Sequence, residues 1–172
     1  MDIRCMQEAA CCFALLAASG IACAASLTGA DRQFMIEAAR TDMIEAHEGQ
    51  MAQDQAGRAD VKTFAGTLVQ DHTNSYVQLT ALATKDGVEI PKGINTGKDR
   101  TIEQLVHLKG DSFDRQFVRD EIAAHRHALA IFKREAARAK DADVKAYAEK
   151  MIPVLEKHLH LAEECAKPVK RG

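Results

Sequence analysis

The sequence predicts an all-α protein, a four-helix bundle made of two helix hairpins. The 172 residues include no Trp and only three Pro, while Ala, Leu, Glu and Lys are plentiful, which is typical of helical proteins. After Thr28, apolar residues recur at helical spacing in long segments separated by short breakers. Residues 59–65 (ADVKTFA) and 142–148 (ADVKAYA) form a weak repeat, which indicates two similar hairpins.

The first 26 residues are predicted to be a signal peptide, followed by one bundle domain over residues 27–172. Arg4 precedes an apolar run from Ala9 to Ala25, and small residues at 24–26 suit a signal peptidase. We therefore expect export to the periplasm. Membrane association is expected only if this segment is retained or lipidated.

Two features keep a membrane anchor as the alternative. Asp2 and Glu8 are unusual in the basic start of a signal peptide, and Cys23 lies in a weak lipoprotein motif. Export also determines which cysteines the mature protein keeps. Cleavage would remove four of the five and leave only Cys165. Cys165 is then either a small apolar residue at a helix end or the site of an intermolecular disulfide.

The first hairpin is predicted from Asp31 to Asp86. Its first helix runs from Asp31 to Gln55, where Gly57 closes it. Its second helix begins with Asp60 as N-cap and ends near Asp86, where Gly87 provides the C-terminal stop.

The second hairpin follows a turn-rich stretch and a short helix over residues 99–109. Gly110 and the polar residues Asp111 and Ser112 open a helix that runs to about residue 140. The last helix begins at Asp141 or Asp143 and ends near residue 167. The connection between hairpins is long enough to cross the bundle, as in ferritin-like folds, and an up-down-up-down order is the alternative.

Three of the predicted helices carry one histidine each on the apolar face, and the first helix carries carboxylates there. The inward positions follow alternating steps of three and four residues. They are Phe34, Ala38, Thr41, Glu45, Glu48 and Ala52; Val61, Ala65, Leu68, His72, Ser75, Leu79 and Leu82; Val118, Ile122, His125, Leu129, Phe132 and Ala136; Val144, Ala148, Met151, Leu155, His158, Ala162 and Cys165.

Four of these inward polar residues are expected at one level of the bundle. Glu45 lies 15 residues before Asp60 and His72 lies 12 residues after it, so a rise of about 1.5 Å per residue places them within roughly one turn of each other. The same count around the second turn places His125 near His158. We therefore predict a polar layer in the middle of the core.

This layer is either a metal site or a metal-free hydrogen-bonded network, because buried polar groups must be satisfied. The predicted metal ligands are Glu45, His72, His125 and His158, with Zn, Fe, Mn or Cu as the ion. Accessory ligands are Glu48, Asp71 and Glu121. A ferritin-type di-iron centre is disfavoured, because no Glu stands three residues before any of these histidines.

The remaining histidines are assigned to no site, and the charge pattern disfavours nucleic-acid binding. His47, His127 and His160 are expected to be solvated, and His107 has no assignable role. Acidic and basic residues are interspersed and the net charge is −2, so nucleic acid is not an expected partner. No nucleophile motif or phosphate-binding loop indicates a substrate, and homo-oligomerisation stays open.

Several motifs resemble a widespread family of exported bacterial proteins that carries a domain of unknown function. They are MIEAHEGQMA (43–52), VQDHT (69–73), AAHRHALAIF (123–132) and MIPVLEKHLHLA (151–162). The resemblance spans residues 31–164. It implies a ferritin-like four-helix fold and no established activity. Members of this family are often labelled membrane or outer-membrane proteins.

Three functions are consistent with these patterns. The first is an exported, stress-related bundle protein of the bacterial envelope that binds a metal. The second is a ferritin-like, metal-dependent oxidase or peroxide-handling enzyme. The third is an envelope interaction module with a metal-free polar core.

Overall fold

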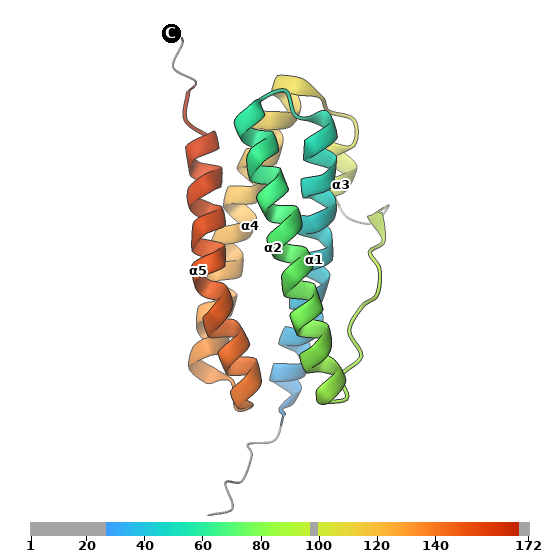
Figure 1. The fold of residues 1–172 in the computed structure, drawn as a ribbon, viewed down its shortest axis with the longest axis vertical. Coiled ribbons are helices and arrows are strands. Elements are labelled where there is room, and N and C mark those ends of the chain that lie inside the picture. Colours follow the sequence, from blue (N-terminus) through green and yellow to red (C-terminus); the bar gives the residue numbers. More distant parts are fainter. Residues whose placement is uncertain (1–26, 97–99, 169–172) are drawn as a thin grey trace, which may run out of the picture.

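The described part of the chain is an all-α bundle, which confirms the predicted fold class. The computed structural model describes residues 27–96 and 100–168, so the predicted signal peptide lies outside it. These residues form four long helices and one short helix (Figure 1), namely α1 (Gly29–Gln55), α2 (Ala59–Lys85), α3 (Arg100–Leu105), α4 (Gly110–Arg138) and α5 (Ala142–Cys165).

The four long helices pair as two hairpins. α1 packs mainly against α2 and α4 mainly against α5, while α2 contacts α5 and α1 contacts α4. After α2, the connection with α3 returns along the length of the bundle, so that α4 starts at the same end as α2 (Figure 1). The predicted crossover is therefore correct, and the up-down-up-down alternative is wrong.

Two helix starts are fixed by side-chain caps. The Thr28 hydroxyl accepts from the Asp31 amide at 3.1 Å and the Asp31 carboxylate accepts from the Thr28 amide at 2.8 Å, which is a capping box. Asp141 accepts from the amides of Asp143 and Val144 at 2.9 and 3.1 Å. Asp141 is therefore the cap of α5.

The other two helix starts differ from the prediction. α2 begins at Ala59 after Arg58, and α4 begins at Gly110 after Lys109. Asp60 and Asp111 therefore lie in the first turn, where a carboxylate interacts favourably with the free amides of the helix start. The Asp60 carboxylate accepts from the Val61 amide at 3.0 Å.

Two hydrophobic clusters fill the two halves of the bundle, and a polar layer separates them. One cluster includes Phe34, Leu79, Phe132 and Leu155, and the other includes Phe64, Leu68, Phe113 and Phe117. Between them each long helix contributes buried polar side chains, which are Asp42, Glu45, Glu48, His72, Ser75, Glu121, His125 and His158. The predicted polar layer is therefore present at mid-height.

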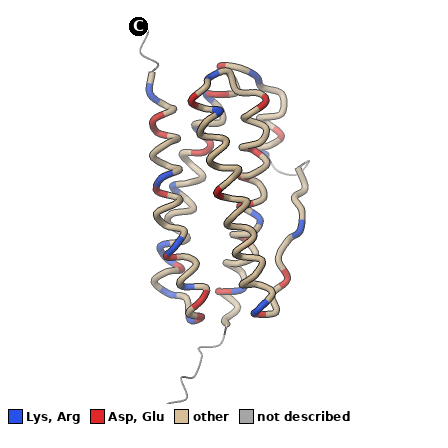
Figure 2. Tube along the Cα trace, in the orientation of Figure 1, with Lys and Arg blue, Asp and Glu red and all other residues tan. Residues whose placement is uncertain are grey.

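The surface is charged and mixed. Lys and Arg are interspersed with Asp and Glu along α4 and α5, whereas α2 carries few charges (Figure 2). Within residues 27–96 and 100–168, no helix is both long and apolar enough to cross a bilayer.

Candidate metal centre

Three histidines from three helices meet in the polar layer. His72 of α2, His125 of α4 and His158 of α5 are each at most 2% exposed. One ring nitrogen from each lies within 4.8 Å of the other two. The hairpins position them, because α5 packs against both α2 and α4.

Outward hydrogen bonds orient two of the rings. His72 Nδ1 lies 2.9 Å from Asp42 Oδ1, and His158 Nε2 lies 3.0 Å from Asp71 Oδ2. Partial burial opposes ionisation of Asp71, but hydrogen bonds from His158 and Lys157 hold its pKa below the ordinary value. Asp71 is therefore ionised and accepts the His158 Nε2–H, which leaves a lone pair on Nδ1 of His158.

The third ring is oriented by its own helix. His125 Nδ1 donates to the backbone carbonyl of Glu121 at 2.9 Å, which leaves a lone pair on Nε2. This Nε2 lies 3.2 Å from His158 Nδ1. Two nitrogens bound to one tetrahedral ion at about 2.0–2.1 Å are roughly 3.3 Å apart. The separation therefore matches two ligands of a shared ion.

His72 completes the convergence. Its Nε2 is buried and has no hydrogen-bond partner among the described residues. Burial, and the proximity of His125, lower the pKa of His72 to about 3. Burial likewise lowers the pKa of His158 to about 4. Both rings are neutral at physiological pH, which is the form that binds metal.

A chain of hydrogen bonds supports His72 on its Nδ1 side, through Asp42. Ser75 donates to Asp42 Oδ2 at 2.7 Å, and the Ser75 hydroxyl lies 2.7 Å from the Tyr147 hydroxyl. Burial raises the pKa of Asp42 to about 8. An acidic residue behind a ligating histidine is the usual support of a metal centre.

The sequence prediction missed Asp42 and placed Thr41 on the inner face. Asp42 is buried, whereas Thr41 is half-buried. The alternative series Met35, Ala39, Asp42, Glu45, Gly49 and Ala52 was the signal that could have found it.

A second group of ligand atoms adjoins the histidines. Glu45 of α1, Glu121 of α4 and His125 each offer one atom within 4.8 Å of the others. The structure therefore places Glu45 with Glu121 and His125 rather than with His72 and His158. Glu121, expected only as an accessory residue, is 1% exposed. The neighbouring Ile122, expected on the inner face, is half-buried.

Burial dominates the electrostatics of this acidic group. It raises the pKa of Glu45 well above the ordinary value, and the charge of Glu121 adds to the effect. Burial and the charge of Glu48 raise the pKa of Glu121 to about 8. Glu121 Oε2 also lies 3.3 Å from His125 Nδ1.

The remaining predicted residues occupy other places. Asp71 contacts His158 from outside, as described, and Glu48 is buried close to Glu121. The other four histidines, His47, His107, His127 and His160, are all exposed. The three expected to be solvated are therefore solvated. The Cys165 thiol is buried, and burial raises its pKa to about 11.

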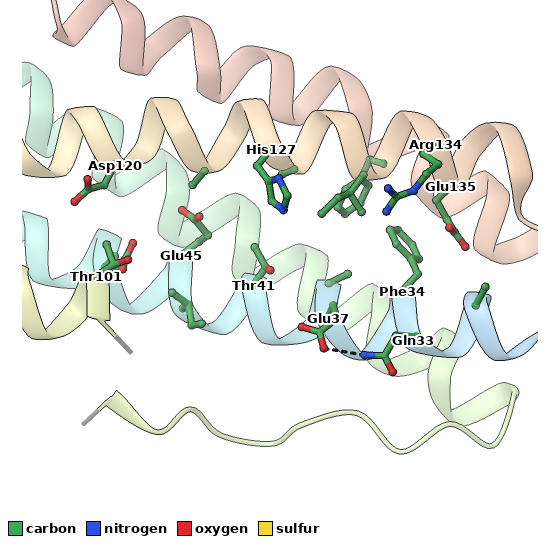
Figure 3. A pocket seen from close by; sticks show the side chains of 18 residues that line it. Gln33, Phe34, Glu37, Thr41, Glu45, Thr101, Asp120, His127, Arg134 and Glu135 are labelled. Carbon is green, nitrogen blue, oxygen red and sulfur yellow. Dashed lines mark hydrogen bonds between the residues drawn. The ribbon is translucent and has the colours of Figure 1, made fainter. Parts of the chain in front are cut away.

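A groove lies between α1 and α4 and leads to the acidic group. Its volume is about 520 Å³. Apolar side chains such as Phe34 and Ile131 line most of it, and Glu45 and Glu48 are among its polar residues. Glu45 points from α1 towards α4, and His127 lines the opposite wall (Figure 3).

Residues 16–165 match the family defined by the domain of unknown function DUF4142. The chain therefore belongs to this family. A comparison with curated proteins found no match.

Solved structures share the fold at low sequence identity. A DUF305 fragment from Deinococcus radiodurans has a TM-score of 0.71 and 15% identity over 81% of this chain and 96% of its own. A DUF305 protein from Streptomyces coelicolor, described as secreted, has a TM-score of 0.68 and 15% identity over 83% and 96%. CopM in the Cu(I)-bound form has a TM-score of 0.66 and 14% identity over 78% and 93%.

Proposed function

We propose that this protein is an exported helical bundle that binds a transition-metal ion, copper above all, through His72, His125 and His158. One observation carries the proposal. Three buried imidazoles converge, and hydrogen bonds on their outer nitrogens direct the other nitrogens to a common point.

A metal-free network accounts for this arrangement less well. The His125 and His158 nitrogens that face each other are both acceptors when their outer nitrogens donate. His72 Nε2 also has no partner among the described residues. A buried polar group without a partner costs about 1–3 kcal/mol. A shared cation removes both penalties.

The donor set and the fold relatives support copper. Zn, Fe, Mn and Cu all accept imidazole, but nitrogen-only ligation favours Cu and Zn over Mn. Cu²⁺ binds most tightly of the divalent first-row ions. CopM, a bundle of the same shape, has been solved in Cu(I)-, Cu(II)- and Ag-bound forms, which supports copper over zinc.

Export would place this function in the periplasm, where the protein would bind copper as part of the stress response of the envelope. The signal-peptide pattern of residues 1–26 supports export, as does the description of the Streptomyces relative as secreted. Fractionation and N-terminal sequencing should find a periplasmic chain that begins near Ala25 or Leu27. A full-length cytoplasmic product would contradict export.

The binding test uses the chain from Leu27 onward and Cu(I) in competition with a chromophoric chelator. We expect one tightly bound ion. Replacing His72, His125 or His158 with Ala should each weaken binding at least 100-fold. His160→Ala is the matched control, because His160 is exposed and lies two residues from His158. Its affinity should stay within twofold of wild type.

Two results would refute the proposal. One is equal loss of binding in His160→Ala and His158→Ala. The other is a wild-type thermal midpoint that copper does not raise, because a ligand that binds only the folded state must stabilise it. The second result would favour the metal-free network.

A further inference from the structure

We propose that Glu45 and Glu121, beside the ring of His125, form a second site for a hard divalent cation such as Mn²⁺. This site is distinct from the three-histidine centre. The His125 ring lies between the two sites, but its Nδ1 donates to the Glu121 backbone carbonyl and is therefore not a ligand of the second ion, so the second site does not depend on copper binding at the first.

The two carboxyl groups face each other across two helices. Glu45 comes from α1 and Glu121 from α4, and ligand atoms of both lie within 4.8 Å of each other and of a His125 nitrogen. Glu121 Oε2 lies 3.3 Å from His125 Nδ1. The His125 ring therefore stands between the two sites, with Nε2 towards His158 and Nδ1 towards the carboxyl groups.

Both carboxyl groups are buried without a cationic side chain to balance them. Glu45 is 5% exposed and Glu121 is 1% exposed. In the described part of the chain, neither forms an ion pair with Lys or Arg. Glu45 Oε2 has no donor within hydrogen-bonding distance there either. A divalent ion would displace the protons that the raised pKa values keep on these carboxyl groups, and it would balance the two charges so formed.

Solvent approaches the second site on its Glu45 side, since Glu121 does not line the groove. The groove between α1 and α4 is lined by Glu45 and Glu48 but by none of the three converging histidines. Glu45 projects into this groove (Figure 3). An ion that enters between α1 and α4 therefore meets carboxylate oxygens first.

The ligand chemistry separates the two sites. Oxygen ligands suit Mn²⁺ and similar hard ions, whereas the all-nitrogen centre suits copper. Two carboxylates leave coordination positions for water, which the groove can supply. We therefore expect Mn²⁺ to prefer the Glu45–Glu121 site.

The test counts bound Mn²⁺ by the loss of the free-ion electron paramagnetic resonance signal, with the metal-free chain from Leu27 onward. Wild type should bind one Mn²⁺. Glu45→Gln and Glu121→Gln should each weaken binding at least tenfold, while His72→Ala and His158→Ala should stay within threefold of wild type. Both glutamine variants replace a carboxyl group with an amide of nearly the same size, and circular dichroism checks that they fold.

Glu37→Gln is the matched control, because Glu37 is an exposed carboxylate of α1 that lines the same groove. It should bind Mn²⁺ as wild type does. Loss of Mn²⁺ in His72→Ala with retention in Glu45→Gln would overturn the second site, and so would equal weakening by Glu37→Gln. Neither result bears on Cu(I) binding, so failure here is distinguishable from failure of the copper centre.

Discussion

His125 Nε2 lies 3.2 Å from His158 Nδ1, although both rings use their other nitrogen to donate to an oxygen. Two lone pairs therefore face each other inside the core. The rings cannot move apart freely, because α4 and α5 pack against each other and each ring is buried. The helix packing holds two ligand atoms ready for a shared ion.

Asp42 should control metal affinity without binding the metal. Asp42→Asn keeps the shape but replaces the carboxyl group beside His72 Nδ1 with an amide. Loss of such a supporting group typically weakens metal binding about 10- to 100-fold. Competition titration with Cu(I) measures the effect. Asp54→Asn is the control, since Asp54 is exposed on the same helix, and an equal loss in both variants would contradict the role of Asp42.

Glu121 should make the metal-free protein less stable as pH rises. Burial raises its pKa to about 8 from an ordinary 4.5. Between these values the unfolded chain releases the proton while the folded chain retains it, so the free energy of unfolding falls as pH rises. Glu121→Gln should weaken this dependence.

Thermal unfolding with a chelator present, at intervals from pH 5 to pH 8, measures the dependence on Glu121. The wild-type midpoint should fall more steeply than that of Glu121→Gln. Glu103→Gln is the control, because Glu103 is exposed. Equal slopes for wild type and Glu121→Gln would show that Glu121 is ionised in the folded state.

Gly49 should be required for the close packing of α1 on α2. A Cβ atom there would lie 2.9 Å from Ala65 O and 3.0 Å from Val69 Cγ2. We expect Gly49→Ala to cost about 1–3 kcal/mol, as overpacking does. At Gly66 nothing lies within 4 Å, so Gly66→Ala should stabilise α2 by about 0.5–1 kcal/mol. Urea unfolding compares them, and destabilisation by both would contradict the steric argument.

Asp114 should tie the turn of the first hairpin to α4. Its carboxylate accepts from the amides of Gly57 and Arg58, both at 3.0 Å. Hydrogen bonds to charged groups contribute about 1.5–3 kcal/mol each, so Asp114→Ala should lower the free energy of unfolding by at least about 2 kcal/mol. Asp111→Ala, one turn earlier and exposed, should change it by less than about 0.5 kcal/mol. Urea unfolding at pH 7 distinguishes the two.

The apolar pattern was sufficient to place the helices and the histidines. Breakers such as Gly87, which has a positive φ of 64°, mark helix ends through local backbone preference alone. His72 and His158 could be placed on the inner face because they continue long, regular apolar series. Counting from the turns then predicted their common level, since the helical rise is constant.

On α1 and α4 the same pattern placed one inward position a residue away from the side chain that is actually buried. It favoured Thr41 over Asp42 and Ile122 over Glu121, whereas the acidic residue is the more buried of each pair. Adjacent positions differ by about 100° around a helix, and either can complete an approximate three- and four-residue spacing. The rotation of each helix about its axis depends on packing with its neighbours, which lies outside local sequence preference.

By itself, then, the sequence determined which segments are helical and which histidines lie near mid-height, because hydrogen-bonding period and helical rise are local properties of the chain. Only the tertiary structure decided that Asp42 supports His72, that Glu45 joins Glu121, and which nitrogen of each ring faces inward. Those features depend on distances between helices and on the acceptor that each ring finds across the core.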